Sequence, residues 1–222
     1  MLKLKNLLES FGFRRTDRPL SHPLVIHAIA GAGKTTLINK FLAEGRNIEV
    51  VTPGKAPDST LTYCENTSTE ELALKVLDEY QAYPHREAFD VLIGDPLQGG
   101  DLPVFEPHYL KEESHRFGVE TCKLLKAAGI HAISSKPDTV IVRHYIGAEP
   151  EGQLIAVDTE GKKYLESFGL NPKFPLEVLG ETFPIVTVLL TRRIKEYPRH
   201  LVYIAFSRHS SRLIVLSPNA PD

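Results

Sequence analysis

The sequence predicts an α/β protein with parallel sheets, and two observations support this fold class. Apolar, β-branched runs alternate along the chain with segments of helical periodicity. In addition, the apolar run at residues 25–29 leads into a loop of small residues and then into a helical pattern at residues 37–42. This order of strand, loop and helix is typical of the crossover that joins parallel strands.

Length and composition allow one large or two small domains. The 222 residues are 42% hydrophobic and 24% charged, as is ordinary for a soluble globular protein. The net charge is only −2, so any binding of nucleic acid requires a local basic groove. Cys64 and Cys122 lack metal-ligand spacing, and we expect them to be reduced thiols of a cytosolic protein. We expect neither a membrane span nor a signal peptide.

Residues 1–22 are expected to form an N-terminal amphipathic segment. Its apolar residues recur at helical spacing: Leu4, Leu7, Leu8 and Phe11. The preferred interpretation is a helix at residues 2–13 that packs on the core. The alternative is a helix that mediates self-association or lies on a membrane surface. A basic stretch at residues 14–19 is expected to be a surface loop.

The remaining elements are predicted from periodicity and turn residues. Residues 72–77 are ambiguous, because Ser68 and Glu71 match a capping box that favours a helix. An apolar run that ends in Asp-Glu is instead typical of a metal-binding strand edge. Residues 99–108 contain Gly and Pro and form a candidate domain junction. Further strands are expected at residues 48–52, 89–93, 139–146, 153–157, 183–190 and 212–216, and helices at residues 112–128 and 162–168.

The loop after the first strand has the composition of a phosphate-binding loop. It consists of Ala30, Gly31, Ala32, Gly33, Lys34, Thr35 and Thr36. Its backbone N–H groups and the N-terminus of the following helix suit a polyphosphate. Lys34 can reach the terminal phosphates, and the Thr35 hydroxyl can bind Mg²⁺. Ala28 stands where the usual spacing has Gly, so the strict pattern is missed by one methyl group.

Other side chains supply the remaining parts that nucleotide hydrolysis requires. These parts are a metal carboxylate, a water activator, a γ-phosphate sensor and arginines for the charge of the transition state. Asp78 and Glu79 are the candidates for the Mg²⁺ carboxylate and the general base. Gln98 is the candidate sensor, and Arg116 and Arg208 are the candidate arginines.

Each of these assignments has a plainer alternative. The two acidic residues could be exposed on a helix, and Asp95, which also ends an apolar strand, could hold the metal instead. Gln98 could be an ordinary loop residue. Arg116 could form a surface ion pair, but a helix N-terminus disfavours a cation, so we expect its guanidinium to point towards phosphate. Arg208, beside His209, could be a solvated helix end.

A basic cluster in the last part of the chain could line an RNA groove, or it could be a solvated positive face. Its members are Arg192, Arg193, Lys195, Arg199 and Arg212. The nine histidines lack a convincing metal-ligand spacing. We expect His27, inside the first strand, to be a hydrogen-bonded core residue.

The order of these segments resembles the superfamily 1 helicases. Six segments correspond to motifs I to VI: residues 30–36, 78–81, 94–98, 114–117, 180–188 and 203–209. The short chain is similar within that superfamily to the first triple gene block protein of flexuous plant RNA viruses. The shared patterns are residues 27–34, 77–80, 95–98 and 106–108. The chain departs from the superfamily at Ala28, at Ser207, where Thr is usual, and before Thr182, where a Gln-Gly lead-in is missing.

The resemblance implies two small RecA-like domains, at about residues 23–110 and 111–222. ATP and Mg²⁺ would bind between them, with Arg116 and Arg208 approaching from the second domain. The implied activity is that of an ATPase and RNA helicase that moves a viral genome through plasmodesmata and suppresses RNA silencing in the host cytoplasm. Implied partners are single-stranded viral RNA, the virion or its capsid protein, the host silencing machinery and further copies of the chain.

Two other functions are compatible with the residues. A small-molecule or nucleoside kinase shares the phosphate-binding loop but needs an acceptor pocket and a lid. An RNA- or partner-binding protein could keep a weak or structural ATP site. Stimulation of ATP hydrolysis by RNA distinguishes the helicase from the kinase. A Glu79→Gln variant that keeps silencing suppression while it loses hydrolysis would favour the binding protein.

Overall fold

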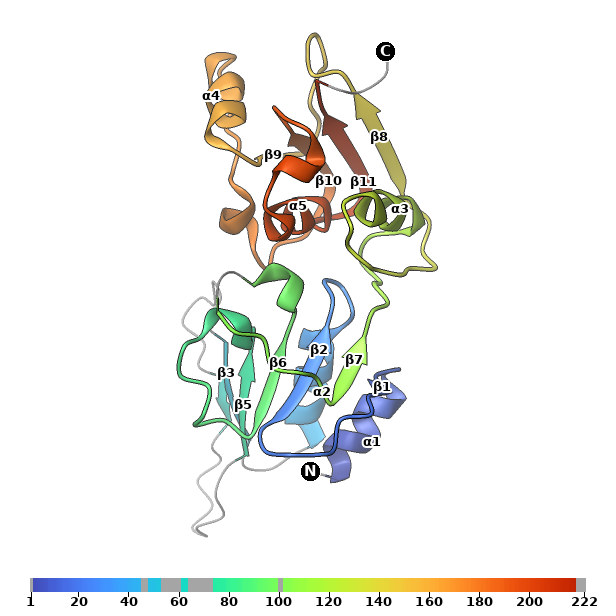
Figure 1. The fold of residues 1–222 in the computed structure, drawn as a ribbon, viewed down its shortest axis with the longest axis vertical. Helices are drawn as coiled ribbons and strands as arrows, with labels where there is room; N and C mark the ends of the chain where they lie inside the picture. Colours follow the sequence, from blue (N-terminus) through green and yellow to red (C-terminus); the bar gives the residue numbers. More distant parts are fainter. Residues whose placement is uncertain (1, 45–47, 53–60, 64–73, 100–101, 219–222) are drawn as a thin grey trace. The chain divides into compact units, whose positions relative to one another are not determined.

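The computed structural model describes residues 2–44, 48–52, 61–63, 74–99 and 102–218. They form two compact units, Met1–Glu112 and Glu113–Asp222, each with its own sheet and helices (Figure 1). Ser68, Glu71 and Cys64, on which part of the sequence interpretation depends, lie outside the described residues. None of the described helices is long and apolar enough to cross a membrane.

The first unit is built on a seven-stranded sheet in the order β1-β7-β2-β6-β5-β3-β4. The central strands run parallel, and β1 and β4 pair antiparallel at the two edges. The carboxyl ends of β2, β6 and β5 therefore meet at one edge of the sheet. The strands are β1 (Arg14–Arg15), β2 (Leu24–Ala28), β3 (Ile48–Val51), β4 (Leu61–Tyr63), β5 (Leu74–Asp78), β6 (Val91–Gly94) and β7 (Tyr109–Lys111).

The helices of the first unit confirm the preferred interpretation of the N-terminal segment. Helix α1 (Leu2–Ser10) packs on α2 (Lys34–Glu44), and its side chains Leu4, Leu7 and Leu8 are buried. Its apolar face is thus covered within the unit. The basic stretch that follows is not only a surface loop, because Arg14–Arg15 form strand β1 and pair with β7. Two short 3₁₀ helices follow β5 and β6, at Tyr80–Ala82 and Pro96–Gln98.

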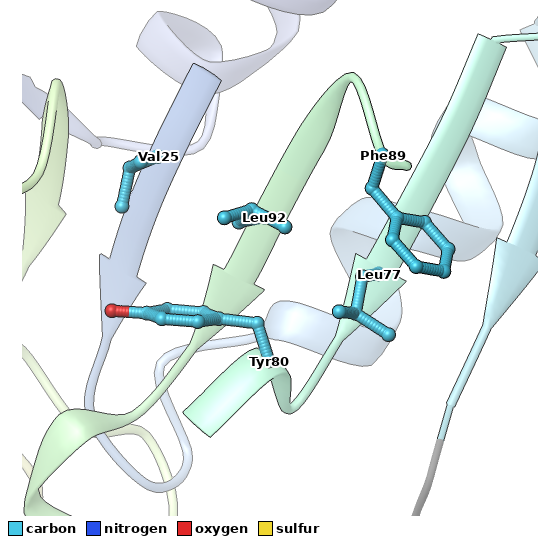
Figure 2. Packing of buried hydrophobic residues seen from close by; sticks show 5 residues of the cluster. All are labelled: Val25, Leu77, Tyr80, Phe89 and Leu92. Atoms are coloured by element: carbon cyan, nitrogen blue, oxygen red, sulfur yellow. The ribbon is translucent and has the colours of Figure 1, made fainter. Parts of the chain in front are cut away.

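One buried cluster joins β2, β5 and β6. Its members are Val25, Leu77, Tyr80, Phe89 and Leu92 (Figure 2). Figure 2 shows the Tyr80 ring extending from the end of β5 across β6 towards β2. The chain that leaves β5 is therefore fixed by the core, and the residues just before Tyr80 are held against the sheet edge.

The helical interpretation of residues 72–77 is wrong for the described part, because Leu74–Asp78 is strand β5. β5 pairs in parallel with β3 on one side and with β6 on the other. Val76 and Leu77 are fully buried. A central parallel strand is covered on both faces, so its apolar run lacks the alternation that marks an exposed strand. These pairings outweigh the local helix signal.

The second unit contains a four-stranded parallel sheet in the order β8-β11-β10-β9. The helices α3 and α5 contact each other. The strands are β8 (Thr139–Arg143), β9 (Gln153–Ala156), β10 (Phe183–Leu189) and β11 (His209–Leu216). The helices are α3 (Val119–Ala127), α4 (Thr159–Ser167) and α5 (Arg199–Phe206), with 3₁₀ turns at Pro175–Val178 and Ile194–Glu196.

The predicted helix at residues 112–128 begins later than expected, at Val119. Gly118 is its N-cap residue, and the Asp138 carboxylate accepts hydrogen bonds from the backbone N–H groups of Glu120 and Thr121 at 2.8 and 3.4 Å. This contact with a distant loop satisfies the donors of the first turn and fixes where the helix starts. The strand β7, which precedes this region, is not among the predicted strands.

Candidate active site

The phosphate-binding loop connects β2 to α2, and its glycines adopt backbone angles that other residues avoid. Gly31 and Gly33 have φ values of 77° and 92°, in the left-handed region that favours glycine. Ala28 belongs to β2 and is buried. Its position needs no left-handed backbone, which explains why alanine is tolerated there. The side chains of Thr35 and Thr36 are exposed at the start of α2.

Lys34 links this loop to the end of β5. Its side chain is only 9% exposed, and its Nζ atom donates to the Ala28 carbonyl oxygen at 3.1 Å. The same Nζ lies 3.6 Å from Glu79 Oε1. The ammonium group therefore stands between the phosphate-binding loop and the acidic pair at the end of β5.

Asp78 and Glu79 occupy the carboxyl end of β5. Asp78 is buried, and its Oδ1 accepts from the Glu79 backbone N–H at 3.0 Å. Burial, and next the negative charge of Glu79, raise the pKa of Asp78 to about 7, although Lys34 lowers it. The interpretation of these residues as exposed on a helix is wrong.

The backbone of Glu79 is strained. Its φ of 51° is the left-handed conformation that non-glycine residues rarely adopt. Such strain clusters at functional sites, where the surrounding structure imposes it. The Gln81 side-chain amide donates to Glu79 Oε2, so the carboxylate direction is fixed by a neighbour as well as by the backbone.

Sequence reasoning missed Gln81, whose only signal was its place in the Asp-Glu-Tyr-Gln segment. The side chain is 5% exposed. A Cβ atom added at Gly94 would lie 2.2 Å from Gln81 Oε1 and 2.8 Å from Tyr80 Cδ1. Glycine at the end of β6 therefore leaves room for the side chains of Tyr80 and Gln81 as they are placed.

Asp95 and Gln98 follow β6, which lies between β2 and β5 in the sheet. Asp95 is fully buried. Its Oδ1 accepts from the Leu97 backbone N–H at 3.2 Å, and its Oδ2 accepts from Gln98 Nε2 at 2.6 Å. Both carboxylate oxygens of Asp95 accept hydrogen bonds from the Pro96–Gln98 turn. Asp78 is therefore the better candidate for the metal carboxylate. The contact also fixes the Gln98 amide near the strand ends.

His27 is a hydrogen-bonded core residue, as predicted. It is buried in β2, and its Nε2 lies 2.6 Å from the Tyr80 hydroxyl. Burial, and next the charge of Arg18, lower the pKa of His27 to about 4. The folded protein thus holds the imidazole neutral.

This neutral imidazole predicts acid-sensitive stability. The unfolded chain takes up the proton near pH 6.5 and the folded chain near pH 4. The stabilisation is therefore complete above about pH 6.5 and is lost as the pH falls through this window. We expect His27 alone to lower the free energy of unfolding by about 2 kcal/mol between pH 7.5 and pH 5.

Thermal unfolding at the two pH values measures this effect. His27→Gln should show a smaller loss of stability on acidification than the wild-type protein. His131→Gln, at an exposed position of the second unit, should keep the full loss. An unchanged pH dependence in His27→Gln would contradict the assignment.

The two candidate arginines lie in the second unit and meet at Ser207. Arg208 is 1% exposed, and its guanidinium donates from Nη2 to the Ser207 hydroxyl at 2.9 Å and from Nε to the Ile204 carbonyl at 3.1 Å. Arg116 Nη1 donates to the Ser207 carbonyl at 3.5 Å. The hydroxyl of Ser207, where the superfamily usually has Thr, thus supports an arginine.

Two expectations about these arginines are wrong. Arg208 is not a solvated helix end, since α5 ends before it and its side chain is buried. Arg116 does not lie early in a helix, because α3 starts at Val119. The argument from the helix dipole therefore does not apply to Arg116, whose direction is set by the loop that precedes α3.

The basic cluster near the C-terminus is partly neutralised within the second unit. Arg192 lies 3.4 Å from Asp158 Oδ2, and Arg212 lies 2.9 Å from Glu151 Oε2. Arg199 donates to the Gly129 carbonyl oxygen. These three guanidinium groups therefore have protein partners, and the assignment of the cluster to an RNA groove stays a prediction.

The strand, loop and helix around Lys34, with an acidic pair at the end of β5 in the same sheet, define a P-loop nucleotide-binding α/β protein. The described residues contain no group of three His, Cys, Asp or Glu side chains that could hold a metal ion. A magnesium ion bound together with a nucleotide needs only one or two protein carboxylates, so this finding agrees with the class.

Comparisons with known proteins narrow this class. The viral superfamily 1 RNA helicase core domain matches residues 24–217. The movement and silencing protein TGBp1 of papaya mosaic potexvirus is 38% identical, over 97% of this chain and 95% of that protein. TGBp1 of Indian citrus ringspot virus is 33% identical, over 97% and 96%. The chain therefore belongs to the viral superfamily 1 RNA helicases and, within them, to the family of movement and silencing proteins TGBp1.

Solved structures agree on the fold. Arterivirus nonstructural protein 10, a helicase, matches with a TM-score of 0.55 and 19% identity, over 98% of this chain and 57% of that chain. Its complex with DNA matches with a TM-score of 0.55 and 20% identity, over 98% and 58%. This chain thus spans little more than half the length of those helicases. The similarity supports two RecA-like domains with parallel sheets.

Proposed function

We propose that this protein is an ATP-hydrolysing RNA helicase that acts in the cell-to-cell movement of a viral genome and in the suppression of host RNA silencing. One observation carries the enzymatic part: Lys34, Asp78 and Glu79 converge at the carboxyl edge of a parallel sheet. Membership of the helicase and TGBp1 families supports the biological part.

The residues at this edge fit ATP with Mg²⁺. Residues 30–36 would hold the phosphates, and the exposed Thr35 hydroxyl and the Asp78 carboxylate would provide oxygen ligands of the kind that Mg²⁺ prefers. Burial raises the pKa of Asp78, and a bound cation would lower it by favouring the ionised carboxylate. When bound, ATP would supply the phosphoanhydride bond that is cleaved, and Mg²⁺ would supply positive charge.

Side chains of the first unit would each have one role in hydrolysis. Lys34 would neutralise charge on the terminal phosphates, and Glu79, oriented by Gln81, would accept a proton from the attacking water. Gln98, oriented by Asp95, would sense the γ-phosphate.

The remaining charge stabilisation would come from the second domain. Arg116 and Arg208, held together at Ser207, would approach the nucleotide when the two domains close. We propose the domains as residues 23–110 and 111–222, with residues 1–22 as an N-terminal segment.

The proposed partners follow from the family. Single-stranded RNA is the proposed substrate, and the arterivirus helicase complex with DNA supports binding of nucleic acid by this fold. Virion or capsid protein, the host silencing machinery and further copies of the chain are proposed partners, with action in the host cytoplasm and at plasmodesmata.

ATP hydrolysis measured with and without single-stranded RNA tests the proposed function. We expect Mg²⁺-dependent hydrolysis that rises severalfold with RNA, because RNA binding would favour the closed, catalytically complete form. Hydrolysis that RNA does not change would contradict the helicase assignment. Phosphate transfer to an added nucleoside would favour a kinase, and RNA binding without any hydrolysis would favour a binding protein with a structural ATP site.

A further inference from the structure

The loop between α3 and β8 (Figure 1) carries none of the helicase motifs. Its hydrogen bonds nevertheless reach both segments that bear the candidate arginines. We call residues 133–138 the clamp loop. Four of its side chains make hydrogen bonds to these segments: Ser134, Ser135, Lys136 and Asp138.

Lys136 joins the two arginine segments directly. Its Nζ atom donates to the carbonyl oxygen of Arg116 at 2.8 Å and also to the carbonyl oxygen of Ser210. Ser210 lies two residues after Arg208 in the sequence. A single ammonium group thus ties the main chain of one arginine to the main chain just beyond the other.

Asp138 makes a second, buried link. Its Oδ2 accepts from the Gly118 backbone N–H at 2.8 Å and from the Thr121 hydroxyl at 2.6 Å. The same oxygen lies 3.2 Å from Nε2 of His209, the residue that follows Arg208. The side chains of Asp138 and His209 are both fully buried. This carboxylate therefore joins the start of α3 to the start of β11.

Two further hydrogen bonds and one close approach hold the segment around Arg116 against the clamp loop. The Ser134 hydroxyl donates to the Ser114 carbonyl at 2.9 Å, and the Ser114 N–H donates to the Ile133 carbonyl at 2.8 Å. A Cβ atom at Gly118 would lie 2.4 Å from the Lys136 carbonyl oxygen. The segment that carries Arg116 therefore has little freedom to shift.

We propose that the clamp loop is a positioning element that fixes the main-chain segments of Arg116 and Arg208 relative to each other, so that the two guanidinium groups act on the nucleotide as one unit. This inference rests on the proposed role of both arginines in hydrolysis. Catalytic groups lose much of their effect when they are displaced by about 1 Å.

Lys136→Met tests the clamp because it keeps most of the aliphatic stem and removes the ammonium group. We expect kcat for ATP hydrolysis to fall by about tenfold to a hundredfold, with KM for ATP unchanged, since the phosphate-binding loop lies in the other unit. Lys136→Arg, which can donate to both carbonyls, should recover most of the rate. Lys126→Met, on the exposed side of α3, is the matched control and should match wild type.

A double-mutant cycle separates positioning from a general loss of folded enzyme. The cycle pairs Lys136→Met with the joint removal of both arginines: in the Arg116→Ala/Arg208→Ala background, Lys136→Met should cause little further loss, because both arginines that it positions are already gone. The same fold loss in both backgrounds would overturn the proposal, as would a wild-type kcat in Lys136→Met. If Lys136→Met does not fold, Ser134→Ala in the same cycle provides the test.

The arginine variants distinguish failure of the clamp from failure of the proposed function. If Arg116→Ala and Arg208→Ala both hydrolyse ATP at the wild-type rate, the arginine roles are wrong and the clamp has nothing to position. If both variants lose activity while Lys136→Met keeps it, the arginine roles stand and the clamp proposal alone is overturned.

Discussion

Lys34→Ala is expected to reduce ATP hydrolysis by about a hundredfold to a thousandfold, the effect of removing one preorganised donor from a reacting oxyanion. The Lys34 ammonium is buried at the junction of the phosphate-binding loop and β5, close to Glu79. Its loss would leave the terminal phosphates facing two carboxylates without the ammonium charge. Single-turnover hydrolysis of labelled ATP measures the loss, and nucleotide binding should weaken as well.

Lys40→Ala is the matched control for this variant. Lys40 lies on the same helix with an exposed side chain, so its removal should leave hydrolysis near the wild-type rate. Turnover of Lys34→Ala at the rate of the control would show that the nucleotide does not bind at this loop.

Glu79→Gln is expected to lower hydrolysis by about a hundredfold to ten-thousandfold, the usual contribution of a general base, while ATP binding remains. The amide has the shape of the carboxylate but cannot accept the proton of the attacking water. The variant should therefore trap ATP that Lys34→Ala fails to hold. Binding of a fluorescent ATP analogue, measured beside single-turnover hydrolysis, gives both quantities.

Glu87→Gln, at an exposed position of the same unit, serves as the control for the loss of one negative charge. Rapid hydrolysis by Glu79→Gln would remove Glu79 from the mechanism. Silencing suppression assayed with the same variant extends the test. Suppression that survives the loss of hydrolysis would assign it to binding rather than to catalysis.

The sequence predicted the first unit well where local pattern and chemistry coincide. The phosphate-binding loop has glycines at the positions that need a left-handed backbone, Gly31 and Gly33. Parallel pairing then gathers the ends of β2, β5 and β6 at one edge. Residues that follow apolar runs, such as Asp78 and Asp95, therefore lie near one another as a consequence of the fold class.

Features that depend on contacts between distant segments could not be predicted in this way. The start of α3 is set by the Asp138 carboxylate, and the Arg116 guanidinium donates to the Ser207 carbonyl oxygen. Both contacts join segments that are distant in the sequence, and local pattern does not indicate which residues will meet. Lys136 shows the same limit, because a lysine in a loop resembles any solvated lysine until its two carbonyl partners are known.

The central claim is that a nucleotide bound at Lys34 is completed by Arg116 and Arg208. The most direct measurement is an experimental structure of the full chain with ADP, Mg²⁺ and aluminium fluoride, which imitates the transferred phosphoryl group. The account predicts that both guanidinium groups donate hydrogen bonds to the fluoride or to the phosphates, with Mg²⁺ on Thr35 and Asp78. Guanidinium groups that point away from the nucleotide in that complex would contradict it.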